Sequence, residues 1–215
     1  MFNLPDPALF IPLIFALGVL PVAVVMLTAY TKIVVVLSLL KNALGVQQVP
    51  PAIVTNGLAL VLTWYVMYPI GLEVWSAVER SPQAGRGVSV MDIAARAKEP
   101  MREFLDKHAT PRERAFFLDA ANRLMGEKIA STLTERDFVV LVPAFAVSEL
   151  TEAFLIGFLI FLPFIVIDLV VANVLMAMGM QMMSPTMVSL PLKLLLFVML
   201  DGWARLLHAL VLTYR

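Results

Sequence analysis

Eight charged side chains lie within the apolar runs of this sequence, where an ionised group needs a specific reason to exist. They are Lys32, Glu73, Glu149, Glu152, Asp168, Lys193, Asp201 and Arg205. A charge at the centre of a bilayer costs about 2.5–3.5 kcal/mol on insertion scales, so such charges mark proton pathways, ion pathways or internal ion pairs. These side chains must therefore face one another, neighbouring subunits or water.

The spacing of these charges predicts particular pairs. Glu149 and Glu152 are three residues apart in SELTEAF, so they share one helical face and repel each other unless a cation lies between them. Lys193, alone in PLKLLLF, is the cation that we expect there. Asp201 and Arg205 are spaced for pairing within one helix. The pairs either stabilise the chain internally or fix the register between identical subunits, the best-attested use of costly buried charges.

Asp168, in PFIVIDLVV, is the carboxylate with the most apolar surroundings. A lone carboxylate within a membrane can carry protons, which would make the protein an ion-coupled secondary transporter with Asp168 as its proton site. Such transporters contain internal repeats with paired broken helices, and this sequence has no visible repeat. A structural ion pair, or a contact with backbone N–H groups, is the commoner role of a buried carboxylate, and we favour it.

Signals for covalent or metal chemistry are missing from the sequence. The chain has no cysteine, and its two histidines, His108 and His208, have no second ligand at metal spacing. It has no glycine-rich phosphate loop and no GxSxG or HExxH motif. The formal net charge is zero, so no basic patch argues for nucleic acid. We expect no catalytic residue, no metal site, no cofactor and no nucleic-acid partner.

Composition places the charges in a membrane protein. The hydrophobic fraction is 60% and the mean hydropathy is +0.88, whereas soluble domains are about 45–50% apolar. A helix needs about 20 apolar residues to span a bilayer. Four runs are long enough: residues 8–30, 52–78, 138–183 and 186–212. The third is long enough for two passes, which predicts a hairpin, and prolines within the runs predict kinks or breaks.

A polar insert, residues 79–137, separates the apolar segments 1–78 and 138–215. The insert holds 11 of the 16 basic and 10 of the 16 acidic side chains. The sequence Thr110-Pro111-Arg112-Glu113 predicts a helix start, because it has the capping-box pattern with Pro at the first helical position. An earlier helix is expected to begin after Ser89 and to be kinked or ended by Pro100.

Lysines give a prediction for the orientation of the chain. Residues 31–51, between the first two runs, carry Lys32 and Lys41 without acidic neighbours. Cytoplasmic loops are enriched in Lys and Arg, so this linker is predicted to face the cytoplasm and the insert the periplasm. No Lys or Arg precedes the first run, so we expect that run to be retained and not cleaved as a signal peptide.

Methionines are concentrated in residues 174–187, VLMAMGMQMMSPTM, which hold six of the 13 in the chain. Four of them have the spacing of one helical face, which is typical of a packing stripe: Met176, Met180, Met183 and Met187. Gly179 and Ser184-Pro185 instead predict breaks that let a loop leave the helices. Met side chains are unbranched and polarizable, so they fill irregular space without one fixed shape.

The apolar segments contain two long distinctive blocks. The first is AYTKIVVVLSLLKNALG followed by PPAIVTNGLALVLTWYVMYP, and the second is VPAFAVSELTEAFLIGFLIFLPFIVIDLVVANVLMAMGMQMMSP followed by LPLKLLLFVMLDGW. These blocks resemble the FliP/SctR family of export proteins in bacterial type III secretion systems. The resemblance covers nearly the whole chain and is weakest in the insert.

The resemblance implies an all-α protein of kinked helical hairpins with a small helical insert. It implies a homopentamer that joins FliQ/SctS-type and FliR/SctT-type proteins, and meets the SctU-type switch protein, in a cone-shaped export gate. The cone stands in the bacterial inner membrane, lies largely on its periplasmic side, contacts membrane lipid and passes unfolded substrate proteins. The resemblance further implies that the energy for export comes from other components of the secretion system.

The resemblance also assigns a role to the methionines. The family's pore is sealed by a ring of methionine-rich loops, and its Met triplet aligns with Met180, Gln181 and Met182, followed by Met183. Gln181 departs from the all-Met flagellar pattern and looks like the injectisome branch. Met176 and Met178 remain assigned to packing.

Overall fold

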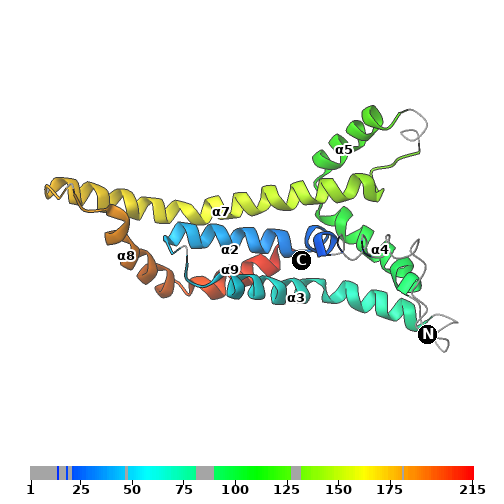
Figure 1. The fold of residues 1–215 in the computed structure, drawn as a ribbon, viewed down its shortest axis with the longest axis horizontal. Helices are drawn as coiled ribbons and strands as arrows, with labels where there is room; N and C mark the ends of the chain where they lie inside the picture. Colours follow the sequence, from blue (N-terminus) through cyan, green and yellow to red (C-terminus); the bar gives the residue numbers. More distant parts are fainter. Residues whose placement is uncertain are drawn as a thin grey trace, which may run out of the picture.

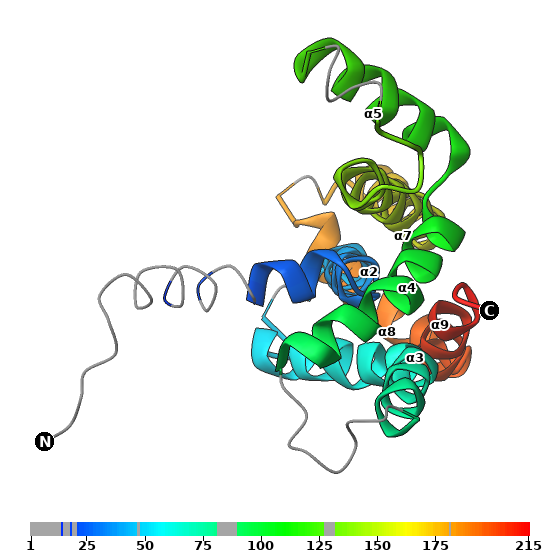
Figure 2. The ribbon, with the colours of Figure 1, turned by 90° about the vertical axis from the view of Figure 1, so that its right-hand side faces the viewer.

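The computed structural model describes residues 14, 18, 21–46, 48–80, 90–126, 132–180 and 182–215, and these form helices with no strand. The all-α prediction is therefore confirmed. The helices are α2 (Tyr30–Leu44), α3 (Ala52–Glu79), α4 (Val90–His108), α5 (Pro111–Leu124), α7 (Phe138–Ala177), α8 (Pro185–Met199) and α9 (Gly202–Leu212). α2, α3, α8 and α9 lie along one side of α7, and α5 lies on the opposite side (Figures 1 and 2).

The longest element, α7, is a single helix of 40 residues, about 60 Å at 1.5 Å per residue. The predicted hairpin within residues 138–183 is therefore wrong. Pro143 and Pro163 lie inside the helix, and no turn sequence accompanies either of them, so the chain continues past both. It turns back only after Ala177, where α8 begins to run beside the end of α7 (Figure 1).

The central helix of the bundle is α2. It lies between α7 and α3 in both views of the ribbon (Figures 1 and 2), and Ile33, Val36 and Leu37 in it are fully buried. The linker expected over residues 31–51 is mostly helix α2, and the lysines that suggested a cytoplasmic orientation, Lys32 and Lys41, are 0% and 9% exposed inside the bundle. Their pairing is internal, so they carry no information about which side faces the cytoplasm.

Local sequence explains where α2 ends. Gly45 adopts a left-handed φ of 79°, a conformation that glycine reaches without a Cβ clash. The N–H groups of Gly45 and Val46 donate to the carbonyls of Asn42 and Lys41 at 3.1 Å each, which closes the last turn. The Lys41 ammonium donates to the Pro50 carbonyl at 2.7 Å and holds the connection toward α3.

Prolines shape the helices less than the sequence predicts. Pro100 is expected to kink or end its helix. It does not end the helix, because α4 continues to His108. Pro69 and Pro191 likewise lie inside α3 and α8. Pro111 and Pro185 instead occupy first-turn positions of α5 and α8, where a missing N–H removes no helical hydrogen bond.

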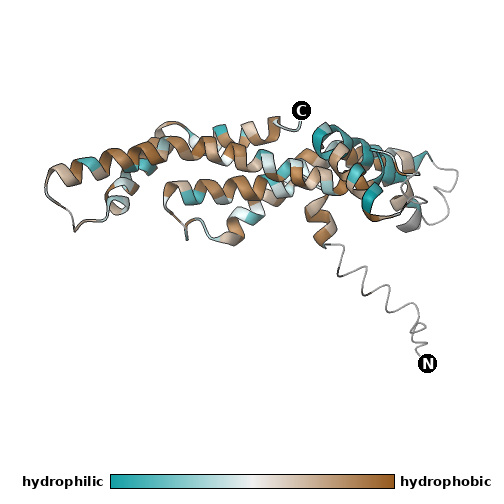
Figure 3. Ribbon diagram, turned by 90° about the horizontal axis from the view of Figure 1, so that it is seen from above, coloured by the Kyte–Doolittle hydropathy of each residue, from teal (hydrophilic) through white to brown (hydrophobic). Residues whose placement is uncertain are grey.

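The polar insert supplies α4 and α5, the hydrophilic group of helices at one end of the molecule (Figure 3). These helices pack on the first part of α7, where a shared cluster is formed by Phe104, Leu105, Ala109, Leu141, Ala144 and Phe145. The predicted helix starts after Ser89 and at Thr110 are confirmed. The Thr110 side chain makes no capping bond; its N–H donates to Ser148 Oγ at 2.9 Å instead.

In the part of the chain that the structure describes, two helices, α3 and α7, are long and apolar enough to cross a membrane. A third crossing would be formed by α8 and α9, which are bent by 62° at the break between them. The outward faces of α3 and α7 stay apolar, as exposures of 75% for Trp64 and 59% for Phe158 show. Of the predicted first run, residues 8–30, the structure describes residues 14, 18 and 21–30.

The contact between α2 and α7 generates a prediction about Gly157. A Cβ built on Gly157 would lie 2.2 Å from Leu39 Cδ1 and 3.0 Å from Leu39 Cβ. We expect Gly157→Val to lower stability by about 1–3 kcal/mol, the usual cost of overpacking. Thermal unfolding in detergent, followed by circular dichroism, measures this change.

Gly57 on α3 is the matched control, because nothing lies within 4 Å of a Cβ built there. Gly57→Val should leave the unfolding temperature close to that of the wild type. Equal unfolding temperatures for the two variants would contradict the close approach of α2 and α7.

Candidate functional site: buried ion pairs and a methionine loop

Lys32 on α2 is the central charge of the bundle, and its side chain is 0% exposed. Its Nζ lies 2.9 Å from Glu149 Oε1 and 2.8 Å from Glu152 Oε2. The shared face predicted for the two glutamates on α7 is therefore present. The contact with Oε1 is an ion pair without the alignment of a hydrogen bond.

The prediction that Lys193 lies between Glu149 and Glu152 is wrong. Lys193 Nζ contacts the carbonyl of Ala43 near the C-terminal end of α2. Lys32 lies near the opposite end of that helix, 11 residues away, or about 16 Å along the axis. Helical spacing identifies the carboxylates that need a cation, but which cation reaches them depends on how distant segments pack.

Tyr214 completes the cluster from the C-terminal end of the chain. Its hydroxyl donates a hydrogen bond to Glu149 Oε2, and its ring lies 4.1 Å from Lys32 Nζ in a cation–π contact. Phe104 stacks on the same ring with centroids 6.2 Å apart. No sequence motif surrounds Tyr214, so sequence reasoning had no signal for its role.

These contacts explain how a bundle with an apolar exterior holds charges inside. Removing one partner of a buried ion pair typically costs about 3–5 kcal/mol, because the other charge remains buried and unpaired. Glu149 is 0% exposed, whereas the Glu152 side chain is 44% exposed and can be hydrated. The Lys32–Glu149 pair therefore fixes the register of α2 against α7, and Tyr214 attaches the C-terminus to the same point.

His108 closes one side of this cluster. Its ring lies 5.2 Å from the Tyr214 ring and 4.6 Å from the Phe104 ring, and its Nδ1 lies 2.9 Å from the Phe104 carbonyl oxygen. Burial lowers the pKa of His108, and the Lys32 and Lys107 charges lower it further, against the raising effect of the Phe104 carbonyl. His108 is a packing histidine, as its isolated position in the sequence predicts.

A second ion pair joins Asp168 on α7 to Lys193 on α8, with 2.6 Å between Oδ2 and Nζ. Ser189 Oγ donates to Asp168 Oδ1 at 2.5 Å, and Lys193 Nζ also donates to the Ala43 carbonyl at 3.2 Å. The group ties α8 to both α7 and α2. Asp168 thus has the cationic partner that the structural interpretation of this carboxylate requires.

The expected pair between Asp201 and Arg205 does not form: no ion pair joins them in the described part of the chain. Asp201 lies at the break before α9, with a left-handed φ of 50°. The i, i+4 rule needs both residues within one continuous helix, whereas Asp201 is the N-cap of α9 and has no helical backbone conformation.

The methionine segment forms a loop at the tip of the α7–α8 hairpin. α7 ends at Ala177, and Gly179 follows with a left-handed φ of 75°. The loop methionines Met180, Met182 and Met183 are 39%, 102% and 45% exposed. Gln181 lies outside the described residues.

The breaks predicted at Gly179 and at Ser184-Pro185 are confirmed, since α8 begins at Pro185. The prediction of one helical stripe from Met176 to Met187 is wrong, because α7 ends at Ala177 and α8 begins only at Pro185. Among the described residues no group of three His, Asp or Glu side chains could hold a metal ion.

Together these features define an all-helical membrane protein with internal ion pairs and an apolar exterior. The chain belongs to the FliP family, whose sequence model matches residues 13–210. This is the family of type III secretion export proteins that includes SctR.

Relatives of known name are similar over nearly their whole length. The hypersensitivity response secretion protein HrcR of Ralstonia nicotianae is 51% identical over 93% of this chain and 94% of its own. The Yop proteins translocation protein R of Yersinia pestis is 47% identical over 100% of this chain and 99% of its own. The flagellar biosynthetic protein FliP of Bacillus subtilis is 41% identical over 93% and 88%. The chain is thus a component of a type III secretion apparatus.

The burial of Lys32 generates a prediction about stability. Lys32→Met leaves Glu149 buried without a cation and should cost about 3–5 kcal/mol. Adding Glu149→Gln to Lys32→Met should recover most of this loss, because the remaining uncompensated carboxylate, Glu152, is 44% exposed. Thermal unfolding of the wild type and of these two variants in detergent measures the effect.

Glu152→Gln combined with Lys32→Met is the matched control, because Glu152 contacts the same ammonium at nearly the same distance. It should recover little stability. Equal recovery by the two double variants would contradict the assignment of Glu149 as the buried partner.

The lowered pKa of His108 predicts a dependence of stability on pH. The unfolded chain binds a proton near the usual histidine pKa of about 6.5, whereas the folded chain binds it only at lower pH. Stability should therefore fall as the pH drops from 7.5 to 5.5. Replacing His108 with Gln should reduce that fall, measured as the unfolding temperature at each pH.

Replacing the exposed His208 with Gln is the control and should keep the wild-type pH dependence, because the surroundings of His108 are unchanged. A His108→Gln variant with the full wild-type dependence would show that other groups cause it.

Proposed function

We propose that this protein is a pore-forming core subunit of the type III secretion export gate, through which unfolded substrate proteins cross the inner membrane. The observation that carries the proposal is the methionine loop at the tip of the α7–α8 hairpin. Met182 in this loop is fully exposed, although a large apolar side chain in water is unfavourable. A ring of such loops, one from each subunit, would cover these side chains against one another.

The chemistry of methionine suits a seal that opens. Its side chain has several rotatable bonds and a polarizable sulfur, so it can close an irregular gap against water and ions. The same flexibility lets it adapt to many substrate sequences as they pass. Gly179 and Ser184-Pro185 free the loop from the helices on either side, so the loop can move without unfolding α7 or α8.

The outward faces of the helices support assembly into a larger complex. Leu155, Phe158 and Leu159 on α7 are 58%, 59% and 58% exposed, and Trp64 and Tyr65 on α3 are 75% and 68% exposed. Large apolar side chains that lie exposed together on one helix in this way mark contacts with protein or lipid. We propose a homopentamer that joins SctS-type and SctT-type subunits in a cone, largely on the periplasmic side, and contacts the SctU-type switch protein.

Internal ion pairing supports a structural and not a proton-carrying role for the charges. Asp168 forms an ion pair with Lys193 and accepts a hydrogen bond from Ser189, the arrangement of a structural carboxylate. The protein would then perform no covalent chemistry and draw its export energy from other components. Higher identity to HrcR and the Yop protein than to the flagellar relative supports the injectisome branch.

Native mass spectrometry of the detergent-extracted protein tests the assembly. The protein is expressed alone and together with its SctS-type and SctT-type companions. We expect a discrete pentamer that takes up the smaller subunits. A stable monomer or dimer that ignores both companions would overturn the proposal.

The seal generates a prediction about ion leakage. Replacing Met180 and Met182 together by Ala should shorten the side chains that close the pore and raise the leak of small ions in cells that produce the complex. The control is Met176→Ala, a similarly exposed methionine within α7, before the loop. Growth under salt stress and a potential-sensitive dye report the leak. A loop variant that leaks no more than the control would contradict the seal.

A further inference from the structure

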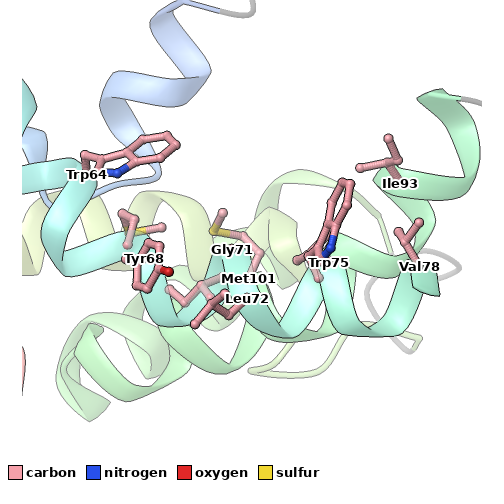
Figure 4. A pocket seen from close by; sticks show the side chains of 11 residues that line it. Trp64, Tyr68, Gly71, Leu72, Trp75, Val78, Ile93 and Met101 are labelled. Atoms are coloured by element: carbon pink, nitrogen blue, oxygen red, sulfur yellow. The ribbon is translucent and has the colours of Figure 1, made fainter. Parts of the chain in front are cut away.

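An apolar groove of about 660 Å³ lies between α3 and α4, apart from the ion pairs and the methionine loop. Figure 4 shows Trp64 at one end and Trp75, Val78 and Ile93 gathered at the other. Met101 of α4 closes part of its wall. The groove is open to the outside, since Trp64 and Trp75 are 75% and 61% exposed.

The lining selects hydrocarbon over a polar ligand. None of the 11 lining residues carries a charge. Their only polar side-chain atoms are two indole N–H groups and one phenol hydroxyl, and the Trp75 N–H already donates to Glu79 Oε1 at 2.8 Å. A polar ligand would therefore lose its hydrogen bonds to water without replacing them, which costs free energy.

The position of the groove along α3 and its length favour a lipid acyl chain as the ligand. The groove runs along α3, which is long and apolar enough to cross a membrane. Residues 64 to 78 extend about 21 Å along the helix axis, enough for an acyl chain that crosses one leaflet of a hydrocarbon core about 30 Å thick.

Arginine side chains at one end of the groove set the direction of a bound acyl chain. The apolar stretch of α3 ends at Val78, where the guanidinium of Arg80 donates to Ser76 Oγ at 2.8 Å and that of Arg96 donates to the Ala77 carbonyl at 2.7 Å. Cations at this end attract a phosphate. Glu79, beside them, offsets part of the attraction. The hydrocarbon contacts therefore supply most of the affinity and the arginines the direction.

We propose that this groove binds one acyl chain of a membrane phospholipid, with its phosphate at the Arg80 end. The bound chain covers aromatic side chains that the protein itself leaves exposed. The inference requires that α3 reaches the hydrocarbon of the membrane, as its length and composition allow. It does not depend on the pentamer or the methionine seal, and failure of either would leave it standing.

Gly71 and Gly57 supply a matched pair of variants. Both are glycines of α3 with nothing within 4 Å of an added Cβ, but only Gly71 lines the groove. Gly71→Trp should fit the helix and fill the space of the acyl chain, and Gly57→Trp should fit the helix and leave the groove open. The two variants therefore share every effect of a bulky side chain except its place.

Native mass spectrometry of the full-length chain, stripped of lipid and titrated with dioleoyl phosphatidylglycerol, measures binding. We expect Gly71→Trp to weaken binding about tenfold, since displacing roughly two methylenes from burial has an effect of this size. Gly57→Trp should bind like the wild type. Equal binding by both variants, or no binding by the wild type, would overturn the proposal.

A second measurement needs no variant. Wild-type protein in vesicles is labelled with a phosphatidylglycerol whose acyl chain carries a photoactivatable diazirine. We expect label on peptides that contain residues 64–78 and Met101. Label confined to the outer face of α7, or a Gly71→Trp variant that loses its oligomeric state but keeps its lipid, would show that the groove receives a protein helix and would overturn the proposal.

Discussion

The fold depends on the burial of one ammonium group. Lys32 is enclosed on α2 with 0% exposure, in a bundle whose other contents are mainly aliphatic. Charge in such a place is tolerated only with counter-charges at contact distance. Two glutamates of α7 meet this requirement, so α2 has one acceptable register against the longest helix. The aromatic side chains of α4 and of the C-terminus then cover the remaining sides of the cluster.

A second consequence concerns which surface faces which solvent. In a soluble helical bundle the apolar stripe turns inward and the charges turn outward. Here several charges outside the insert turn inward, and the outward surfaces of α3 and α7 are apolar. The hydrophilic helices are restricted to one end (Figure 3). The surface along the length of the molecule therefore suits contact with lipid or other apolar subunits, and the surface at one end suits contact with water.

Much of this arrangement could be predicted from local sequence. The all-helical class, the starts of α4 and α5, and the breaks at Gly179 and Pro185 follow from composition, caps and turn residues, because these act within a few positions. The partner of Glu149 could not be predicted, since Lys32 and Lys193 are equally plausible cations until α2 is placed. The continuity of α7 was missed because a run long enough for two passes can equally form one long helix, and Pro143 and Pro163 lie inside that helix without ending it.

The length of α7 has a mechanical consequence. Leu39 presses against Gly157 at mid-helix, and Ala177 lies 20 residues further on, about 30 Å along a rigid rod. With that contact as fulcrum, a rotation of about 10° of α7 together with α8 would carry the loop end through roughly 5 Å, one helical turn. It would break no backbone hydrogen bond in the helix, but it would release the contact of Lys193 with the Ala43 carbonyl of α2. The helix is then a lever arm, and its stiffness converts a small adjustment in the packed half of the molecule into a displacement as wide as a side chain at its tip.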